Sequence, residues 1–418
     1  MSQSVLGLLT LAYQMVWDRQ RHPVAVLLTV DNAAASAGTT PQAVDGAHLL
    51  GALAQVWSEQ SPTLILSPRE RTLLLDLLQH ALPNGPWIAV HDTELADPSV
   101  LAATQRAHER GMKLVWRGEQ GQRADDTVAV HFERCLVSPA PGTAHHAAPA
   151  TDTPAGPFKP GQIFNAAGSR VLAEQCLEDH QAWGVAGWPS DDVLKGYHGR
   201  QIQPSRRNLD KLLQLADQDA PLEALEHGLD DDPVLVYRFL RYFNSAALGL
   251  RSPVESLRHG LMLQGMSRFH DWLAEQLPQA SDDLNLEPVR ATMVLRARLM
   301  QQLLDAGEED KLRQAAYLCG LLSRIDLLLG ESMTSALERL ALPVAVGEAI
   351  LSNSGPFAPY LEVAAALEHP PAKSVAELCE THGLDVGDVN RALLRVLAHA
   401  QGGQAWAVAG FQNSRAFR

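Results

Sequence analysis

The sequence predicts two domains of different class, an α/β domain followed by an all-helical domain. Short β-type runs alternate with helical stretches in the first half, and from Arg206 onward the β-type runs vanish. A chain of 418 residues is also longer than one ordinary core, so two domains of about 200 residues each are expected.

The first half has the pattern of a (βα) repeat. Apolar runs rich in β-branched residues predict strands over 24–30, 63–66, 87–90, 113–116 and 127–131. Helical spacing of apolar residues between them predicts helices over 46–59, 69–81 and 98–110, with Pro98 in a first turn.

Domain boundaries follow from shifts in composition. Residues 138–161 are rich in proline, glycine and alanine, which predicts a loop inside the first domain. We therefore place an α/β domain at 1–200, a helical domain at 205–400 and a tail at 401–418.

Amphipathic stripes define the second half. Leu209, Leu212 and Leu213 form one stripe, and Leu235 and Phe239 belong to another. Proline and glycine breaks divide this half into helices of ordinary length.

Composition excludes several functions. The formal net charge of −14 disfavours binding to a nucleic-acid backbone, which requires a concentrated basic surface. The four cysteines show no CxxC spacing, which favours reduced and mostly buried thiols. No apolar run of about 18 residues is present to span a bilayer, and the apolar start lacks the basic flank of a signal peptide, so we expect a cytoplasmic protein.

One segment of the helical half carries a specific pattern. Residues 231–245 read DDPVLVYRFLRYFNS, and residues 256–265 read SLRHGLMLQG. These runs resemble the signature of HDOD domains, which are catalytically silent relatives of HD phosphohydrolases. The resemblance covers roughly the second half of the chain and implies an all-helical signalling domain.

Several runs of the first half carry a second pattern: residues 13–16 read YQMV, 64–67 read LILS, 89–94 read AVHDTE and 128–131 read VAVH. With these runs the first half resembles a degenerate EAL domain, the fold of cyclic di-GMP phosphodiesterases. The resemblance implies that the glycine-rich run at 183–189 closes a barrel. Intact relatives carry an acidic residue where Gln14 stands, and an asparagine strand is matched by residues 64–67. The later acidic strand is matched by 89–94 and the lysine strand by 128–131, while the paired aspartates are replaced by Trp116, Arg117 and Gly118.

These replacements have a chemical consequence. Two-metal hydrolysis of a phosphodiester requires several carboxylate oxygens to hold the ions and position a water. The resemblance thus implies a catalytically inactive domain, and we expect no catalytic residue, no bound metal and no cofactor.

Three short motifs could suggest a catalytic or metal-binding site. Glu223, Ala224 and Leu225 spell the EAL tripeptide but lie in the helical half, and the acidic run at 230–232 is expected to be a helix start. The dipeptide His270 and Asp271, together with His227 and Asp326, could be assembled into a metal site. Its flanks lack the pattern of active HD enzymes, so we interpret these residues as ordinary helix positions.

A polar face accompanies the HDOD-like signature. Asp232 is expected to cap a helix that begins at Pro233. Arg238, Arg241 and Asn244 recur at three-residue spacing beside its apolar face, and these are the candidate partner-contact residues. The alternative is that they brace neighbouring helices.

Together these observations predict a non-catalytic signal-transduction scaffold that acts through protein–protein contacts in a cyclic-di-GMP-related pathway. Its expected partners are other signalling proteins, with a homodimer left open, and neither nucleic acid nor a membrane span is expected. Two alternatives remain: a cyclic di-GMP receptor that does not hydrolyse its ligand, and an HD-type metal-dependent phosphohydrolase.

Overall fold

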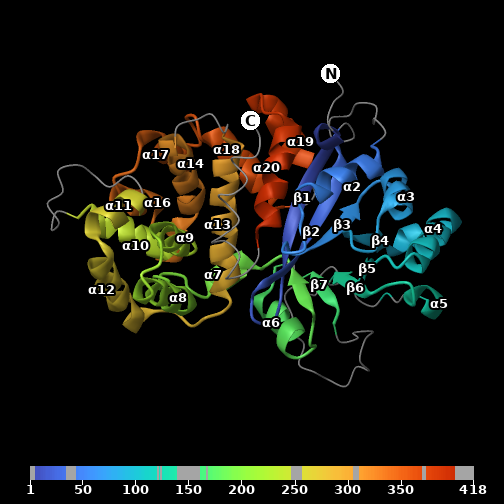
Figure 1. Ribbon diagram of the computed structural model, residues 1–418, viewed down its shortest axis with the longest axis horizontal. Helices are drawn as coiled ribbons and strands as arrows, with labels where there is room; N and C mark the ends of the chain where they lie inside the picture. Colours follow the sequence, from blue (N-terminus) through green and yellow to red (C-terminus); the bar gives the residue numbers. More distant parts are fainter. Residues whose placement is uncertain are drawn as a thin grey trace. The chain divides into compact units, whose positions relative to one another are not determined.

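The computed structural model describes residues 5–33, 44–119, 122, 125–138, 161–165, 168–245, 257–304, 310–369 and 373–400. Almost all of the loop expected at 138–161, and the tail expected at 401–418, lie outside these residues. The described chain forms two compact units (Figure 1). Unit 1 comprises residues up to 192 together with 365–400, and unit 2 comprises residues 193–364.

Unit 1 is built around a closed eight-stranded barrel in which the strands follow one another in chain order. β1 runs antiparallel to both of its neighbours, and the remaining pairs are parallel. The strands are β1 (Leu9–Trp17), β2 (Pro23–Asn32), β3 (Thr63–Pro68), β4 (Trp87–His91), β5 (Leu114–Glu119), β6 (Arg134–Ser138), β7 (Ile163–Asn165) and β8 (Gly184–Ala186).

The barrel closes where the glycine-rich run predicted it. Val16 and Trp17 of β1 pair with Ala186 and Val185 of β8. A side chain on Gly184 would meet Val16 Cγ1 at 2.5 Å, so a glycine is needed for β8 to approach β1 this closely. The α/β class expected for the first half is confirmed, with a first strand that runs against the others.

The strand predicted over 127–131 is wrong. These residues form the short helix α5 (Asp126–Ala129), whose start is capped by the Asp125 side chain accepting from the N–H of Thr127. The strand that pairs with β5 is β6, a few residues later. The alternation of Thr127, Val128 and Val130 resembles a strand, yet Val130 is 66% exposed and contributes nothing to the barrel.

Helices cover the outside of the parallel strands, as Figure 1 shows. Asp97 accepts from the N–H of Ser99, and Pro98 occupies the first turn of its helix, as expected. A core between β5–β8 and a covering helix contains Trp116, Phe164 and Cys176. The covering elements are η1 (Val5–Leu8), α2 (Gly46–Ala54), α3 (Arg71–His80), η2 (Asp92–Ala96), α4 (Pro98–Glu109) and α6 (Arg170–Glu178).

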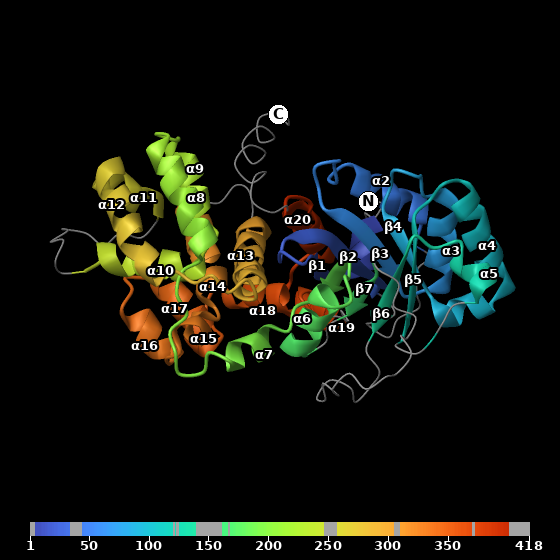
Figure 2. The same ribbon diagram turned by 90° about the horizontal axis from the view of Figure 1, so that it is seen from below.

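The last two helices belong to unit 1 although they follow unit 2 in the sequence. α19 (Lys373–His382) and α20 (Val386–Ala398) lie beside β1 in both views (Figures 1 and 2). Asn390, which is fully buried, donates from its side-chain amide to the carbonyls of Leu6 at 2.8 Å and Leu9 at 2.7 Å. The sequence placed these helices in the helical domain at 205–400, whereas they pack on the first strand of the barrel.

Unit 2 is all-helical, as predicted. Its core joins apolar faces of successive helices, with Leu235, Phe239 and Leu273 fully buried. The helices are α8 (Arg206–Asp217), α9 (Leu222–Asp230), α10 (Pro233–Phe243), α11 (Leu257–Gln264), α12 (Met266–Gln276), η5 (Leu277–Gln279), α13 (Leu286–Leu303), α14 (Asp310–Leu322), α15 (Ile325–Leu329), α16 (Met333–Glu338) and α17 (Val344–Ser352). Two further helices, α7 (Ser190–Lys195) and α18 (Ala358–Leu367), contain the boundaries between the units.

Two sequence expectations concern the whole chain. Within the described residues, no helix combines the length and the apolar character that crossing a bilayer requires. Burial raises the pKa of the Cys176 and Cys319 thiols to about 12 and that of the Cys379 thiol to about 11. These three thiols are therefore poor nucleophiles.

The Asn390 contact predicts a measurable contribution to stability. Asn390→Ala removes the donors to two carbonyls, so the free energy of unfolding should fall by about 1–3 kcal/mol in urea denaturation. Arg391→Ala is the matched control on the same helix, because Arg391 is 40% exposed and forms a surface ion pair with Asp388. The control should change stability by about 0.5 kcal/mol or less. Equal losses in the two variants would show that α20 is not held through Asn390.

Candidate functional site

The barrel interior is divided into an apolar layer and a polar layer. Buried apolar side chains from all eight strands meet in one cluster, formed by Val16, Ala25, Leu27, Ile65, Ala89, Val115, Leu136, Ile163 and Ala186. Trp87 and Trp183 stack beneath it with ring centroids 5.7 Å apart, and the Arg134 guanidinium lies 4.5 Å from the Trp183 ring. This end of the barrel is therefore filled by packed side chains.

A polar layer lies above the apolar cluster, on the side of the carboxyl ends of the parallel strands. Seven of the strands contribute a polar residue to it. Side chains alternate along a strand, so a residue two positions beyond a core residue faces the same way. These positions hold Gln14, Thr29, Ser67, His91, Arg117, Ser138 and Asn165. The carboxyl ends of barrel strands are where enzymes of this architecture hold their substrates, so we call these seven residues the mouth layer.

Arg117 is the central charge of the mouth layer. Its Nη1 donates to Ser67 Oγ at 2.8 Å, so the guanidinium extends from β5 past β4 to β3. Burial lowers the pKa of Arg117, and repulsion from Arg69 lowers it further. His91, on the strand between them, has its pKa lowered by burial and then by Arg117. The sequence comparison had placed Gln14, Ser67 and Arg117 where an active EAL domain carries its functional residues, and the structure brings all three to the mouth layer.

The mouth layer does not fit the divalent metals that the EAL resemblance implies. Magnesium and manganese prefer oxygen ligands, and two-metal sites use several carboxylates. The layer offers amide, hydroxyl and imidazole groups and one guanidinium, which repels a cation. Among the described residues, no group of three or more histidine, cysteine, aspartate or glutamate side chains is arranged to hold a metal ion.

A second polar centre lies in unit 2, at the start of α10. The Asp232 carboxylate is fully buried and caps this helix, accepting from the N–H groups of Val234 at 2.9 Å and Leu235 at 3.1 Å. Its other oxygen accepts from the N–H of Ser205 at 2.6 Å. The aspartate of the HDOD-like signature therefore fixes the start of α10 and the residue that caps α8.

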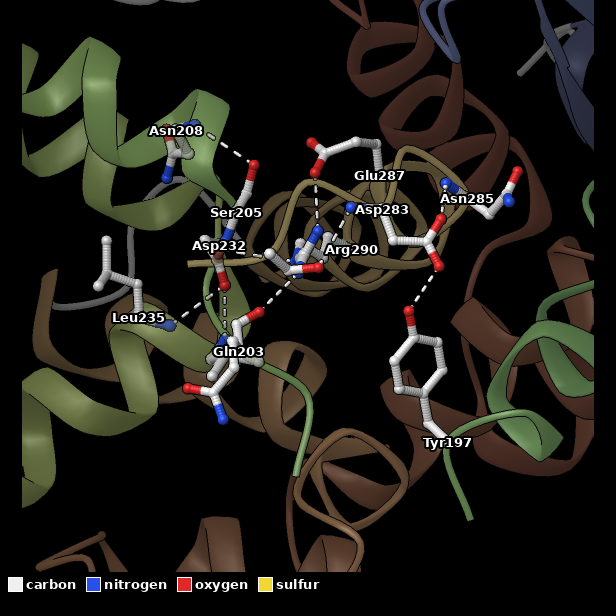
Figure 3. Close-up of polar contacts among 12 residues, drawn as sticks. Tyr197, Gln203, Ser205, Asn208, Asp232, Leu235, Asp283, Asn285, Glu287 and Arg290 are labelled. Carbon is white, nitrogen blue, oxygen red and sulfur yellow. Dashed lines mark hydrogen bonds and ion pairs between the residues drawn. The ribbon is translucent and has the colours of Figure 1, made fainter. Parts of the chain in front are cut away.

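Arg290 supplies the opposite charge to Asp232 (Figure 3). It projects from α13, is 2% exposed, and its Nε lies 3.6 Å from the Asp232 carboxylate. Its other nitrogens donate to Glu287 and to the backbone carbonyl of Gln203, each at 2.7 Å. Sequence reasoning missed this arginine. A signal was present, because Arg290 shares a helical stripe with Met293, Val294 and Ala297, all of them buried.

The three predicted partner-contact residues occupy different environments. Arg238 is partly buried and donates to Gln276 Oε1 at 3.0 Å and to Gln203 Oε1 at 2.5 Å. Arg241 is exposed, and Asn244 forms the C-cap of α10. Arg238 is thus tied to the polar centre around Asp232 through Gln203, whereas Arg241 faces solvent.

The acidic residues at 230–232 each lie in a separate structural environment. Asp231 forms ion pairs with Lys211 and Arg298, each at 3.1 Å. Burial raises the pKa of Asp230 well above its ordinary value, and the Tyr317 hydroxyl donates to its backbone carbonyl at 3.1 Å. Burial and the neighbouring Asp230 likewise raise the pKa of Tyr317.

The other two motifs considered in the sequence, the His270–Asp271 dipeptide and the EAL tripeptide at 223–225, lie on helices. His270 is 39% exposed and approaches Asp217 at 3.2 Å and Asp271 at 3.7 Å. Glu223 pairs with Arg258 on α11 at 2.6 Å. Both arrangements are ordinary contacts between helices or along one, and the absence of a metal at His270 stays a prediction.

Comparison with known protein families identifies one domain of this chain. Residues 207–346 match the HDOD domain family. The match lies within unit 2 and contains the α10 signature, Arg290 and most of the helices that pack around them. The eight-stranded barrel before it is consistent with the EAL-like domain expected from the sequence.

Two curated proteins are similar to part of this chain. An uncharacterized protein of Bacillus subtilis, YuxH, is 24% identical over 52% of this chain and 56% of its own length. The protein of Vibrio cholerae called cyclic di-GMP phosphodiesterase CdgJ is 23% identical over 58% of this chain and 58% of its own length. The chain thus matches little more than half the length of either relative.

One solved structure is also similar, the MmoQ response regulator from Methylococcus capsulatus. It is 20% identical, with a TM-score of 0.38, over 46% of this chain and 98% of that chain.

The Asp232 centre predicts a large loss of stability on truncation. Asp232→Ala leaves Arg290 buried without its counter-charge, so the free energy of unfolding should fall by about 3–5 kcal/mol. Asp232→Asn keeps one oxygen that can accept from the N–H groups of Val234 and Leu235, although not from that of Ser205, and should lose less. Asp282→Ala is the control, because Asp282 is 73% exposed and forms a surface ion pair with Arg206. Urea denaturation of the full chain measures all three, and similar losses for Asp232→Ala and Asp282→Ala would rule out a central role for Asp232.

Proposed function

We propose that this protein is a non-catalytic signal-transduction scaffold that acts through protein–protein contacts. The observation that carries the proposal is the composition of the mouth layer, where a guanidinium and neutral groups stand at the carboxyl ends of the barrel strands. Metal-dependent phosphodiester hydrolysis needs carboxylates at such a place. The HDOD match supports a signalling role for the helical unit.

The pathway is proposed from similarity. One partial relative carries the name cyclic di-GMP phosphodiesterase, and this supports placing the chain in a cyclic-di-GMP-related pathway. Its partners are then other signalling proteins. The exposed side of α10 that contains Arg241 is the proposed contact surface, because arginine offers planar, multidentate hydrogen bonding at interfaces.

A receptor for cyclic di-GMP is the second candidate function. Arg117 favours it, since a guanidinium in the mouth layer can bind a phosphate without any metal. An HD-type phosphohydrolase is the remaining alternative, and the half-exposed His270 with its two aspartates is the group it would have to use.

The expected absence of phosphodiester hydrolysis is tested on the purified full chain. With magnesium or manganese, cyclic di-GMP should be hydrolysed no faster than in a buffer blank, because the mouth layer lacks the ligands for either ion. An active EAL enzyme in the same assay is the positive control. Turnover that depends on metal and is lost in His270→Ala or Arg117→Gln would overturn the proposal.

The contact surface is tested by separating stability from binding. Arg238→Ala should lower the melting temperature, because Gln203 and Gln276 lose their donor. Arg241→Ala should leave the melting temperature unchanged and reduce the recovery of partner proteins by the full chain. Both variants remove the same charge from the same helix, so each controls the other. Unchanged recovery by Arg241→Ala would remove this surface from the proposal.

A further inference from the structure

Three acidic side chains gather at the carboxyl-terminal end of α9. Glu226 and Asp230 lie one helical turn apart, and Asp231 is the C-cap residue of the same helix. The carboxyl end of a helix carries a partial negative charge, which disfavours further negative charge there. Like charges four residues apart on a helix also repel each other. This end of α9 therefore needs nearby cations, or protons on its carboxylates, to be stable.

The nearby cations are bound to Asp231. Lys211 of α8 and Arg298 of α13 each lie 3.1 Å from its carboxylate. Among the described residues, Asp230 has no ion pair of its own. Arg298 acts on Asp230 electrostatically and lowers its pKa, but burial acts more strongly in the opposite direction. The pKa of Asp230 is therefore well above its ordinary value.

The remaining groups that face Asp230 lie on α9 and on α14. Glu226 and Asp231 raise the pKa of Asp230 through repulsion between like charges. Burial also raises the pKa of Glu226, although Arg258 of α11 lies 3.9 Å away. Tyr317 of α14 is buried and donates to the backbone carbonyl of Asp230 at 3.1 Å. Its hydroxyl also lowers the pKa of the Asp230 carboxyl, but less than burial and the like charges raise it.

We propose that Asp230 is a proton switch in the helical unit: it is a neutral carboxylic acid while the end of α9 contacts α13 and α14, and loss of its proton loosens that end. An ionised Asp230 would be a buried charge beside two other carboxylates at the negative end of a helix dipole. Asp231 and Asp232 follow directly and hold α8, α10 and α13, so loosening at Asp230 reaches all three helices. The inference goes beyond the proposed scaffold function, which requires no proton-dependent element.

The direction of the pH dependence follows from the raised pKa. The folded chain holds the Asp230 proton more tightly than the unfolded chain does. This contribution to stability is complete below the ordinary aspartate pKa of 3.8 and is lost as the pH rises through the raised pKa. Burial lowers the pKa of the neighbouring His227, whose titration acts in the opposite direction. The effect of Asp230 is therefore measured as a difference between variants that share His227.

The test compares the melting temperatures of the full wild-type chain and of Asp230→Asn between about pH 5 and pH 9. The amide has the shape of the neutral carboxyl but cannot lose a proton. The melting temperature of Asp230→Asn should therefore rise relative to that of the wild type by about 3 °C or more toward the alkaline end. Asp210→Asn is the matched control, because it removes the same charge from an exposed position on α8. Glu226→Gln removes a like charge and should move the wild-type transition to lower pH.

A second measurement does not depend on unfolding. In the full chain with carbon-13 at the aspartate side-chain carboxyls, one resonance should report a protonated aspartate at neutral pH. That resonance should be lost in Asp230→Asn and kept in Asp210→Asn. The inference fails if no aspartate of the wild type is protonated at neutral pH, a result that stands even where Asp230→Asn does not fold. It also fails if the difference in melting temperature is independent of pH or is reproduced by Asp210→Asn.

Discussion

The Asp232 carboxylate is the contact on which the helical unit depends. A buried charge is costly unless hydrogen bonds and an opposite charge compensate it, and here three backbone N–H groups and Arg290 do so together. Because the partners come from the segment before α8, from α10 and from α13, one carboxylate sets the relative positions of three helices. Gln203 also connects this centre to Arg238, because it accepts hydrogen bonds from both Arg238 and Arg290. The polar face of α10 therefore stabilises the helical unit through Arg238, and Arg241 is left exposed to solvent.

The barrel illustrates how one architecture separates stability from function. Its apolar layer and stacked tryptophans fill one end, and this packing is independent of what the other end holds. Side chains in the mouth layer can therefore change from acidic to basic without altering the strand order. A resemblance in fold thus leaves the chemistry to be argued from individual residues such as Gln14 and Arg117.

Much of this could be predicted from the sequence, and the failures have physical causes. The two fold classes and the helix start at Asp232 follow from local patterns of apolar spacing and capping, and the closure by the glycine-rich run follows from the resemblance to EAL domains. The strand at 127–131 was misassigned because alternation of β-branched residues also occurs in a short exposed helix. Arg290 was overlooked because its role depends on a partner on another helix, and the place of α19 and α20 depends on Asn390 reaching carbonyls at the opposite end of the chain. The apolar stripe around Arg290 indicates that this residue is buried but does not identify its partner, and the contact between α20 and the first strand leaves no local signature.

The return of α20 to β1 also determines the order in which the protein can be completed during synthesis. The Asn390 to Leu6 contact joins residues 384 positions apart, and all of unit 2 is made between them. At a typical translation rate, the first strand waits roughly 20–80 seconds for the helix that covers it. Unit 2 can fold during that interval, but unit 1 cannot be completed until α20 has emerged from the ribosome. A nascent chain therefore exposes the apolar surface of β1 until α20 has been made.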